Sequence, residues 1–460
     1  MAVLLCSWLP AGAAFNSLLK EIPKLTGQSE ILLLLSLDDG SVIFSQNENK
    51  QSAPASLTKL VTAILTLENC ADTKTVLTLR QEIFETYNAF DSSNAGLLAG
   101  EELSVEELLY CLLLPSANEA AQVLADSVGG GEAPGSAKEN IARFVAMMND
   151  FAARLGCTNT HFENAHGLDA AGHLTTAADI AKILRYALSA DFPGNALFET
   201  IVATREHKLP ATNKHGARNI YSTNLMLNAA RKEYYLQGIA GIKTGHTSQA
   251  GECITAMASR DGFKYLCIVM RGQQAALESG GAKFNTAFID CKALLDWSFA
   301  HIRYQRVVPA DTVVGELPVA LARATDHVQL VPQTPLSALV PEGVDSGSVY
   351  IEMIQEDPPR ELTAPIKKGE VLAQARVLYA GQEFARIDLV ASETINRSAS
   401  MYLVELAKQA IGNRITHLLL IAVIFVAVLY LVAIYLKGRS KRQEKQMRVL
   451  PDIQPGGKKK

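Results

Sequence analysis

The sequence predicts a mixed α/β domain followed by a small all-β domain and a C-terminal transmembrane helix. Strand-like and helical patterns alternate between about residues 29 and 300, whereas residues 302–395 consist of short β-rich runs separated by Pro, Gly and Asp. Residues 415–436 are mostly apolar and carry no formal charge. With 460 residues, the chain is long enough for two folded units with accessory segments.

Two strand pairs and a series of helices can be placed in the α/β region. The stretch ILLLLSLDDGSVIFSQ predicts a hairpin that turns at Asp39-Gly40, and Asp261-Gly262 marks a second tight turn between ECITAMAS and FKYLCIVM. The glycines 129–131 predict a helix end. The expected helices are an apolar one that starts at Ser56 and those at 104–113, 118–128, 139–155, 176–190 and 284–300.

The β-rich region contains runs such as VQLVP, SVYIEMI and FARIDLV but no catalytic constellation, so we expect a spacer or interaction module. The segment YLVELAKQAIGN then predicts a helical stalk that leads to the membrane. The expected divisions of the chain are an incomplete signal peptide at 1–14, the α/β domain at 25–300, the β-rich domain at 301–395, the stalk at 396–414, the membrane helix at 415–436 and a basic tail at 437–460.

The distribution of charge indicates how the chain crosses a membrane. As a helix, the 22 residues 415–436 would extend about 33 Å, which is enough for a bilayer core. Residues 437–460 contain nine Lys or Arg and two acidic residues, which leaves a net charge of −11 on the rest of the chain. The positive-inside rule then predicts a cytoplasmic tail and an exported body. The acidic body also argues against nucleic acid as a partner.

The N-terminus carries only part of a signal-peptide pattern, and neither the cysteines nor the histidines match a disulfide or metal-site pattern. The stretch MAVLLCSWLPAGAA has the apolar run and the small residues of a signal peptide but lacks a positive n-region. The seven cysteines are scattered singly without a C-x-x-C pair, which indicates small buried residues rather than a disulfide framework or a zinc site. The spacing of His161, His166 and His173 matches no familiar ligand pattern, so we expect no metal.

A lysine lies near the start of an otherwise apolar helix. The stretch PASLTKLVTAILTLENC places Ser56 three residues before Lys59, which makes them neighbours on a helix. Burial would favour the neutral, proton-accepting amine, and the backbone N–H of Ser56 at the helix start could face a negative charge. These are the parts of an acyl-transfer site. On this segment alone, it is equally plausible that Lys59 reaches solvent and that Ser56 caps the helix.

Two later segments carry similar polar groups. Ser116 and Asn118 follow a proline stop and precede a helix, so they would lie at a loop tip, although helix capping alone would explain them. Lys243, Thr244 and Gly245 begin a strand-like segment, where a cation and a hydroxyl could attract the carboxylate of a peptide that pairs with the strand. The alternative for Lys243 is a solvated turn lysine.

In this order, the three segments form the Ser-x-x-Lys, Ser-x-Asn and Lys-Thr-Gly set of penicillin-interacting serine acyltransferases. The chain resembles the D-alanyl-D-alanine carboxypeptidases, which are low-molecular-mass penicillin-binding proteins of serine peptidase family S11. The resemblance spans roughly residues 28–400 and includes LLAGEELSVEELLYCLLLPSANEAA, NTHFENAHGL and GIKTGHTSQAG. It implies an α/β transpeptidase/β-lactamase-like catalytic domain, in which helices flank an antiparallel sheet.

The resemblance also implies three catalytic residues. Ser56 would be the acylated nucleophile and Lys59 its general base, while Ser116 would help to pass the proton to the departing D-alanine. The substrate-binding residues would be Asn118 for the substrate amide, Lys243 for positive potential, Thr244 for the terminal carboxylate, and Gly245 and His246 beside them. The backbone N–H groups of Ser56 and His246 would form the oxyanion hole.

The implied function is that of a serine D-Ala-D-Ala carboxypeptidase in the bacterial cell membrane, which removes the terminal D-alanine from peptidoglycan stem pentapeptides. Such an enzyme is acylated by β-lactam antibiotics and needs no cofactor. One feature departs from the family, because many members carry an arginine for the substrate carboxylate in the loop RGQQAALESGGAKFNTAF. Arg271 lies too early for this position, and Lys283 is only a candidate replacement.

Three alternatives remain open from the sequence. A β-lactamase shares the acylation motifs but needs a deacylating base, and the chain has no Glu-x-x-Leu-Asn pattern of the kind that supplies it. A DD-endopeptidase would use the same machinery on cross-linked peptides. A non-catalytic wall-binding scaffold could keep the fold, although it would have no need for all three motifs.

Overall fold

The structure is a computed structural model, and it describes residues 23–85, 93–132, 134–276, 282–354, 362–379, 382–412 and 414–447. The expected signal peptide at 1–14 and the last part of the basic tail lie outside these residues. The chain divides into two compact units. The first contains residues 1–307, 337–350 and 377–385, and the second contains residues 308–336, 351–376 and 386–460.

A five-stranded antiparallel sheet forms the centre of the first unit, with the strand order β2-β1-β9-β8-β7. Strand β1 is buried along its whole length because its side chains alternate between two cores. Ile31, Leu33 and Leu35 enter the larger core, and Leu32 and Leu34 enter the smaller one. The strands are β1 (Ile31–Ser36), β2 (Val42–Gln46), β7 (Ile239–Thr247), β8 (Gly251–Arg260) and β9 (Phe263–Gly272).

Both predicted hairpin turns are confirmed. Strands β1 and β2 pair in antiparallel register around the turn that contains Gly40, which has a positive φ of 78°. Between β8 and β9, Asp261 and Gly262 both have positive φ values, 53° and 85°, as a tight two-residue hairpin turn requires.

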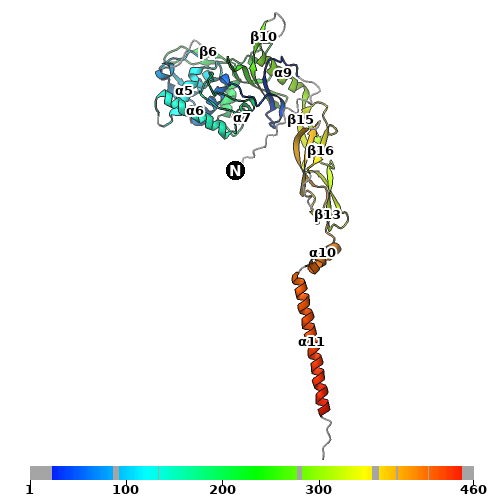
Figure 1. Cartoon of the computed structure of the whole chain (residues 1–460). Coiled ribbons are helices and arrows are strands. Elements are labelled where there is room, and N and C mark those ends of the chain that lie inside the picture. Colours follow the sequence, from blue (N-terminus) through cyan, green and yellow to red (C-terminus); the bar gives the residue numbers. More distant parts are fainter. Residues whose placement is uncertain are drawn as a thin grey trace, which may run out of the picture. The chain divides into compact units, whose positions relative to one another are not determined.

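Helices cover both faces of this sheet. One group, which includes α5, α6 and α7, packs on the face of the larger core, and α9 packs on the other face (Figure 1). The predicted helices are confirmed to within a few residues at their ends. The bounds are α2 (Lys59–Asn69), α3 (Gln81–Glu85), α4 (Val105–Leu113), α5 (Asn118–Gly130), α6 (Ala137–Arg154), α7 (Ala177–Ala187), α8 (Asn195–Ala203) and α9 (Thr286–His301).

The helix end predicted at the glycines 129–131 is confirmed, because α5 ends at Gly130 and is followed by Gly131, which has a positive φ of 46°. One detail of the helix prediction was wrong. The α-helix expected to start at Ser56 begins at Lys59, because Ser56 lies in the preceding 3-10 turn η1 (Ala55–Thr58). The further short elements of this unit are η3 (Leu225–Leu227) and the strand pairs β3 (Val76–Thr78) with β4 (Glu102–Ser104), β5 (Glu206–Leu209) with β6 (Arg218–Tyr221), and β10 (Gln274–Ala276) with β11 (Lys283–Asn285).

The segment after α9 is rich in strands, as predicted. Its main sheet has the order β16-β18-β19-β14-β13-β17, and buried residues such as Val328, Leu330 and Leu389 form a separate core. The strands are β13 (Gly315–Ala320), β14 (His327–Pro332), β16 (Val349–Met353), β17 (Leu362–Thr363), β18 (Val371–Tyr379) and β19 (Gln382–Ala391), and a separate pair is formed by β12 (Ile302–Val308) and β15 (Leu336–Pro341).

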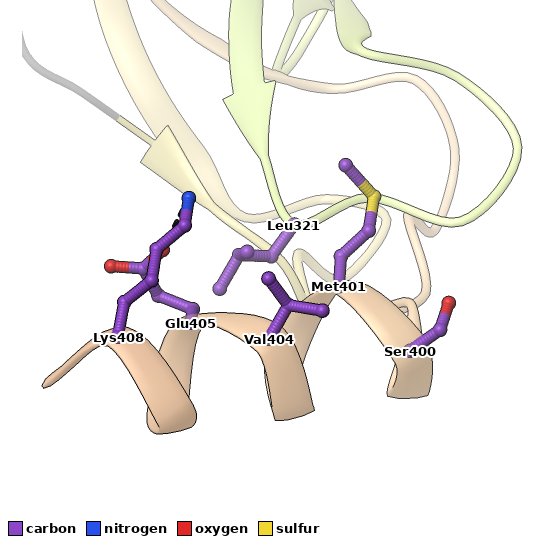
Figure 2. A pocket seen from close by; sticks show the side chains of 6 residues that line it. All are labelled: Leu321, Ser400, Met401, Val404, Glu405 and Lys408. Carbon is purple, nitrogen blue, oxygen red and sulfur yellow. Dashed lines mark ion pairs between the residues drawn. The ribbon is translucent and has the colours of Figure 1, made fainter. Parts of the chain in front are cut away.

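Two helices follow the β-rich sheet. Helix α10 (Ala399–Gly412) forms at the expected stalk, and a shallow cavity of about 250 Å³ lies between it and Leu321. Met401 and Val404 point toward Leu321, and Lys408 forms an ion pair with Glu405 (Figure 2). Helix α11 (Arg414–Met447) contains, at residues 417–439, a stretch long and apolar enough to cross a membrane.

Candidate active site

Ser56 is fixed by close contacts with two glycines. A Cβ atom on Gly245 of β7 would lie 3.0 Å from the backbone nitrogen of Ser56. A Cβ on Gly167 would also lie 3.0 Å from this nitrogen, and only 1.9 Å from the carbonyl oxygen of Ala55. Because any larger residue would displace the backbone here, the two glycines allow two distant segments to approach the start of α2.

Lys59 is completely buried beneath Ser56. Its Nζ lies 2.9 Å from Ser56 Oγ, 2.6 Å from Asn118 Oδ1 and 2.6 Å from the carbonyl oxygen of His166. The last two atoms can only accept hydrogen bonds. As an ammonium, Nζ can donate to all three atoms, whereas the neutral amine has two N–H donors for Asn118 and His166 and a lone pair that is left for the hydroxyl hydrogen of Ser56.

The surroundings of Lys59 favour this neutral form. Burial lowers its pKa well below the usual value, the charge of Lys243 lowers it further, and Glu119 acts in the opposite direction. The alternative in which Lys59 reaches solvent is therefore wrong. The alternative role for Ser56 is also wrong, since its side chain makes no capping hydrogen bond at η1 or α2.

A buried histidine supports the backbone before Ser56 from behind. The backbone N–H of Glu163 donates to His173 Nδ1 at 2.8 Å, which leaves the proton on Nε2 to be donated to Thr58 Oγ1 at 2.9 Å. Thr58 Oγ1 in turn donates to the carbonyl oxygen of Ala55 at 2.8 Å. Ala55 has a positive φ of 48°, so this chain of hydrogen bonds holds an unusual backbone conformation directly before Ser56.

Ser116 and Asn118 face Ser56 from the start of α5. The N-cap residue of α5 is Ala117, and no side chain caps this helix end, so the capping alternative is wrong. Ser116 adopts a left-handed conformation with a φ of 66°. Such strain in a residue other than glycine or asparagine is typical of functional sites.

Lys243 lies on β7 and is only 1 % exposed, so the alternative of a solvated turn lysine is wrong. Its Nζ donates to Ser116 Oγ at 2.9 Å and to the carbonyl oxygen of Thr244 at 2.8 Å. Burial lowers the pKa of Lys243 to about 7. Lys59 and Lys243 thus each contact the hydroxyl of a serine that lines the same cleft.

These elements enclose a cleft with a volume of about 450 Å³. Six of the eight residues predicted for the site line it, and the other two, Lys59 and Lys243, reach it through their hydrogen bonds to Ser56 and Ser116. The residues that line the cleft are Ser56, Ser93, Ser116, Asn118, Gly167, Leu168, Thr223, Leu225, Thr244, Gly245, His246, Thr247, Glu252, Asn285 and Phe288.

Neither of the cations considered for the missing arginine lines this cleft. Arg271 binds Glu30 Oε2 at 2.5 Å and the carbonyl oxygen of Gln249 at 3.0 Å. Lys283 is an exposed residue of β11. Among the residues that the structure describes, no arginine lines the cleft.

Several residues of the cleft were not predicted from the sequence. Thr223 Oγ1 lies 2.5 Å from Thr244 Oγ1, so two hydroxyls that line the cleft meet. Glu252 and Asn285 line the same cleft, and their side chains are hydrogen-bonded to each other at 2.6 Å. Thr223 lies in the short polar run Ser-Thr-Asn, which resembles any turn, and Glu252 resembles any residue at the start of a strand.

The three histidines considered for a metal site have other partners. His173 takes part in the hydrogen bonds behind Ser56, and His161 contacts Glu163 at 3.1 Å. Burial lowers the pKa of His166 to about 3, and the charge of Lys59 lowers it as well. Within the residues that the structure describes, no group of three or more His, Cys, Asp or Glu is arranged to hold a metal ion.

The family model for D-alanyl-D-alanine carboxypeptidases matches residues 19–274, more than half of the chain. The chain belongs to the D-alanyl-D-alanine carboxypeptidase family. It is therefore a serine-type carboxypeptidase, a peptidase of the hydrolase class. A second family model, for the C-terminal domain of penicillin-binding protein 5, matches residues 303–397.

Curated relatives agree with this membership, and solved structures share the fold. The chain is 26 % identical over 383 residues to the D-alanyl-D-alanine carboxypeptidase DacF of Bacillus subtilis, with 82 % of this chain and 89 % of that protein covered. It is 27 % identical to DacC of Escherichia coli, with 79 % and 83 % covered. Penicillin-binding protein 5 of Haemophilus influenzae shares the fold, with a TM-score of 0.57, 22 % identity, and 82 % of this chain and 99 % of that chain covered.

A further solved structure extends the similarity of the fold. The D-alanyl-D-alanine carboxypeptidase DacD of Francisella tularensis has a TM-score of 0.61 at 19 % identity, with 83 % of this chain and 97 % of that chain covered. The predicted fold class, a transpeptidase-like catalytic domain followed by a β domain and an apolar helix, is confirmed.

Proposed function

We propose that the protein removes the terminal D-alanine from peptidoglycan stem pentapeptides through an acyl-enzyme on Ser56, and that penicillin acylates the same serine. The observation that carries this proposal is the environment of Lys59. Its lone pair is left for the Ser56 hydroxyl, because its other two contacts are acceptors. Membership in the carboxypeptidase family supplies the substrate class.

In the first step, Lys59 Nζ takes the hydroxyl proton while Ser56 Oγ attacks the carbonyl carbon between the two D-alanines. The oxyanion is bound by the backbone N–H groups of Ser56 and His246, and the lack of a side chain on Gly245 allows β7 to approach Ser56 closely. The C–N bond then breaks, and Ser116, which is hydrogen-bonded to Lys243, passes the proton held by Lys59 to the leaving amine. A water molecule then gives a proton to the neutral Lys59 as its oxygen attacks the ester, and this proton returns to Ser56 Oγ when the ester bond breaks.

Binding of the stem peptide uses the remaining motif residues. Asn118 is hydrogen-bonded to Lys59 and also lines the cleft, where it can bind the substrate amide. Lys243 supplies positive potential, and the Thr244 hydroxyl binds the terminal carboxylate together with Thr223. Neither a metal nor a cofactor takes part in these steps.

The C-terminal segment anchors the enzyme in the bacterial membrane as a single span. Residues 417–439 of α11 supply the length and hydropathy. The nine basic residues of 437–460 support a cytoplasmic tail by the positive-inside rule, with the catalytic unit on the outer side of the membrane.

The test uses the full-length protein in detergent. It is incubated with a pentapeptide that ends in D-Ala-D-Ala, with a cross-linked muropeptide dimer and with penicillin, and the products are separated by mass. Release of free D-alanine from the pentapeptide supports the proposal. Cleavage of the dimer alone would identify an endopeptidase. Rapid turnover of penicillin would identify a β-lactamase, and the absence of any reaction with all three compounds would identify a scaffold.

A further inference from the structure

Residues 165–169 connect two elements of the candidate site, the helix α2 and the strand β7. On the side of α2, Thr62 Oγ1 donates to the carbonyl oxygen of Ala165 at 2.6 Å, and Lys59 Nζ donates to the carbonyl oxygen of His166 at 2.6 Å. The backbone of this segment is thus a direct partner of the proposed base. Where the segment lies therefore affects where Lys59 lies.

Asn164 fixes the conformation of the segment from its N-terminal end. Its Oδ1 accepts from the backbone N–H groups of His166 at 3.3 Å and Gly167 at 2.6 Å, and its Nδ2 donates to the carbonyl oxygen of Leu168 at 2.9 Å. Gly167 and Leu168 both line the cleft. Because these local hydrogen bonds limit independent motion of the residues, a displacement of the segment would also displace this wall of the cleft.

On the side of β7, the segment is held by the side chain of Asp169. Thr247 Oγ1, at the end of β7, donates to Asp169 Oδ1 at 2.6 Å, a short distance that is typical of a carboxylate acceptor. The backbone N–H of Gln249 and the hydroxyl of Ser248 approach Oδ2 at 3.3 Å and 3.4 Å. Asp169 thus ties the segment to the last residue of β7 and to the turn that follows it.

We propose that Asp169 is a positioning residue that sets the separation between the start of α2 and β7, and with it the geometry of the oxyanion hole. This inference rests on the proposed function. The two oxyanion donors come from these two elements, since Ser56 lies in the turn that leads into α2 and His246 precedes Thr247 on β7. Such donors stabilise the transition state only within a narrow range of distances. Asp169 itself does not line the cleft, so it acts through its hydrogen bonds.

The test measures the release of D-alanine from diacetyl-L-Lys-D-Ala-D-Ala by the full-length protein in detergent. Rates are expressed per site that penicillin titrates, so that misfolded protein does not count. Asp169→Ala should lower kcat by about tenfold and change KM by less than about twofold, because displaced oxyanion donors weaken the transition state more than substrate binding.

Asp39→Ala is the matched control for the loss of a carboxylate that fixes a turn. Asp39 accepts from the hydroxyl of Ser41 at 2.7 Å and from its backbone N–H at 3.0 Å, but it belongs to the turn between β1 and β2 and does not line the cleft. This variant should release D-alanine at the wild-type rate.

The partner hydroxyl tests the hydrogen bond itself. Thr247→Val keeps the size of the side chain but cannot donate to Asp169, whereas Thr247→Ser can. We expect Thr247→Val to lower kcat by about five- to tenfold and Thr247→Ser to restore most of it. The double variant Asp169→Ala/Thr247→Val should be less than about twofold slower than Asp169→Ala, because both changes remove the same contact.

A wild-type kcat in Asp169→Ala, a loss that appears in KM alone, or additive losses in the double variant would overturn the inference and leave the proposed function standing. If Asp169→Ala does not fold, equal rates for Thr247→Val and Thr247→Ser would overturn it. A wild-type protein that releases no D-alanine would overturn both.

Discussion

Lys59 Nζ lies 2.9 Å from Ser56 Oγ, and its other two contacts are oxygens that can only accept hydrogen bonds. Burial, which also removes the water that would stabilise a charged amine, lowers the pKa of Lys59 well below its usual value. Ser56 and Lys59 therefore meet the two requirements for a nucleophile and its base: they are in contact, and the base can accept a proton at neutral pH.

Replacing Lys59 by arginine tests the role of proton acceptance. Arginine keeps N–H donors in place but stays protonated at neutral pH, so it cannot take the proton of Ser56. We expect the second-order rate of acylation by penicillin to fall by about 10³. Lys182→Arg is the control, because Lys182 lies on α7, bonded to Asp179, and does not contact Ser56. A Lys59→Arg protein that keeps more than a tenth of the rate would argue against a base at this position.

Replacing Gly245 by alanine tests the close approach of β7 to Ser56. The new Cβ would lie 3.0 Å from both Ala55 Cβ and the Ser56 nitrogen, so one of the two segments must move by a few tenths of an ångström. We expect acylation to slow by about tenfold, because small displacements at a reacting centre are costly. Gly216→Ala meets no atom within 4 Å and should react like the wild type. If the two variants acylate at the same rate, the tight contact does not position the nucleophile.

The buried histidine behind Ser56 predicts a pH-dependent stability. Burial lowers the pKa of His173 to about 4, below the ordinary value of about 6.5 that it regains on unfolding. The unfolded chain therefore binds the extra proton between these two pH values, and the stabilisation from neutral His173 is complete above pH 6.5 and lost as the pH falls toward 4. The effect amounts to about 3 kcal/mol.

His173→Gln removes this dependence. The free energy of unfolding of the wild type should fall more steeply than that of the variant between about pH 6.5 and 4, as measured by denaturant titration at several pH values. His166 titrates in the same direction, but it is present in both proteins and cancels in the difference. His161→Gln, at an exposed histidine, should follow the wild type. Parallel curves for His173→Gln and the wild type would contradict a neutral, buried His173.

Much of the fold was predictable because its signals are local. Alternation along β1, the Asp-Gly turns and the apolar periodicity of the helices each depend on a few neighbouring residues. The boundary at Ser56 was missed because the positive φ of Ala55 depends on the packing of Gly167 against it, a contact between segments more than one hundred residues apart in the sequence.

The residues of the candidate site also include some that could be predicted from the sequence and some that could not. Ser56, Ser116 and Lys243 could be found because each belongs to a short motif, and the structure brings all three to one cleft. Thr223 and Glu252 belong to no motif, and their place beside Thr244 and His246 follows only from how the strands and loops meet. Residues that act through tertiary contacts alone leave no pattern in a single sequence.

The most direct test of the account is the site of penicillin attachment. The full-length protein is incubated with penicillin, digested, and its peptides are analysed by mass spectrometry, with Ser56→Ala and Ser93→Ala treated in parallel. Ser93 is a second serine that lines the cleft but contacts neither buried lysine through a hydrogen bond that the structure describes. We predict one adduct, on the peptide that contains Ser56, present in Ser93→Ala and absent from Ser56→Ala. An adduct on another residue, or one that persists in Ser56→Ala, would contradict the assignment of Ser56 as the nucleophile.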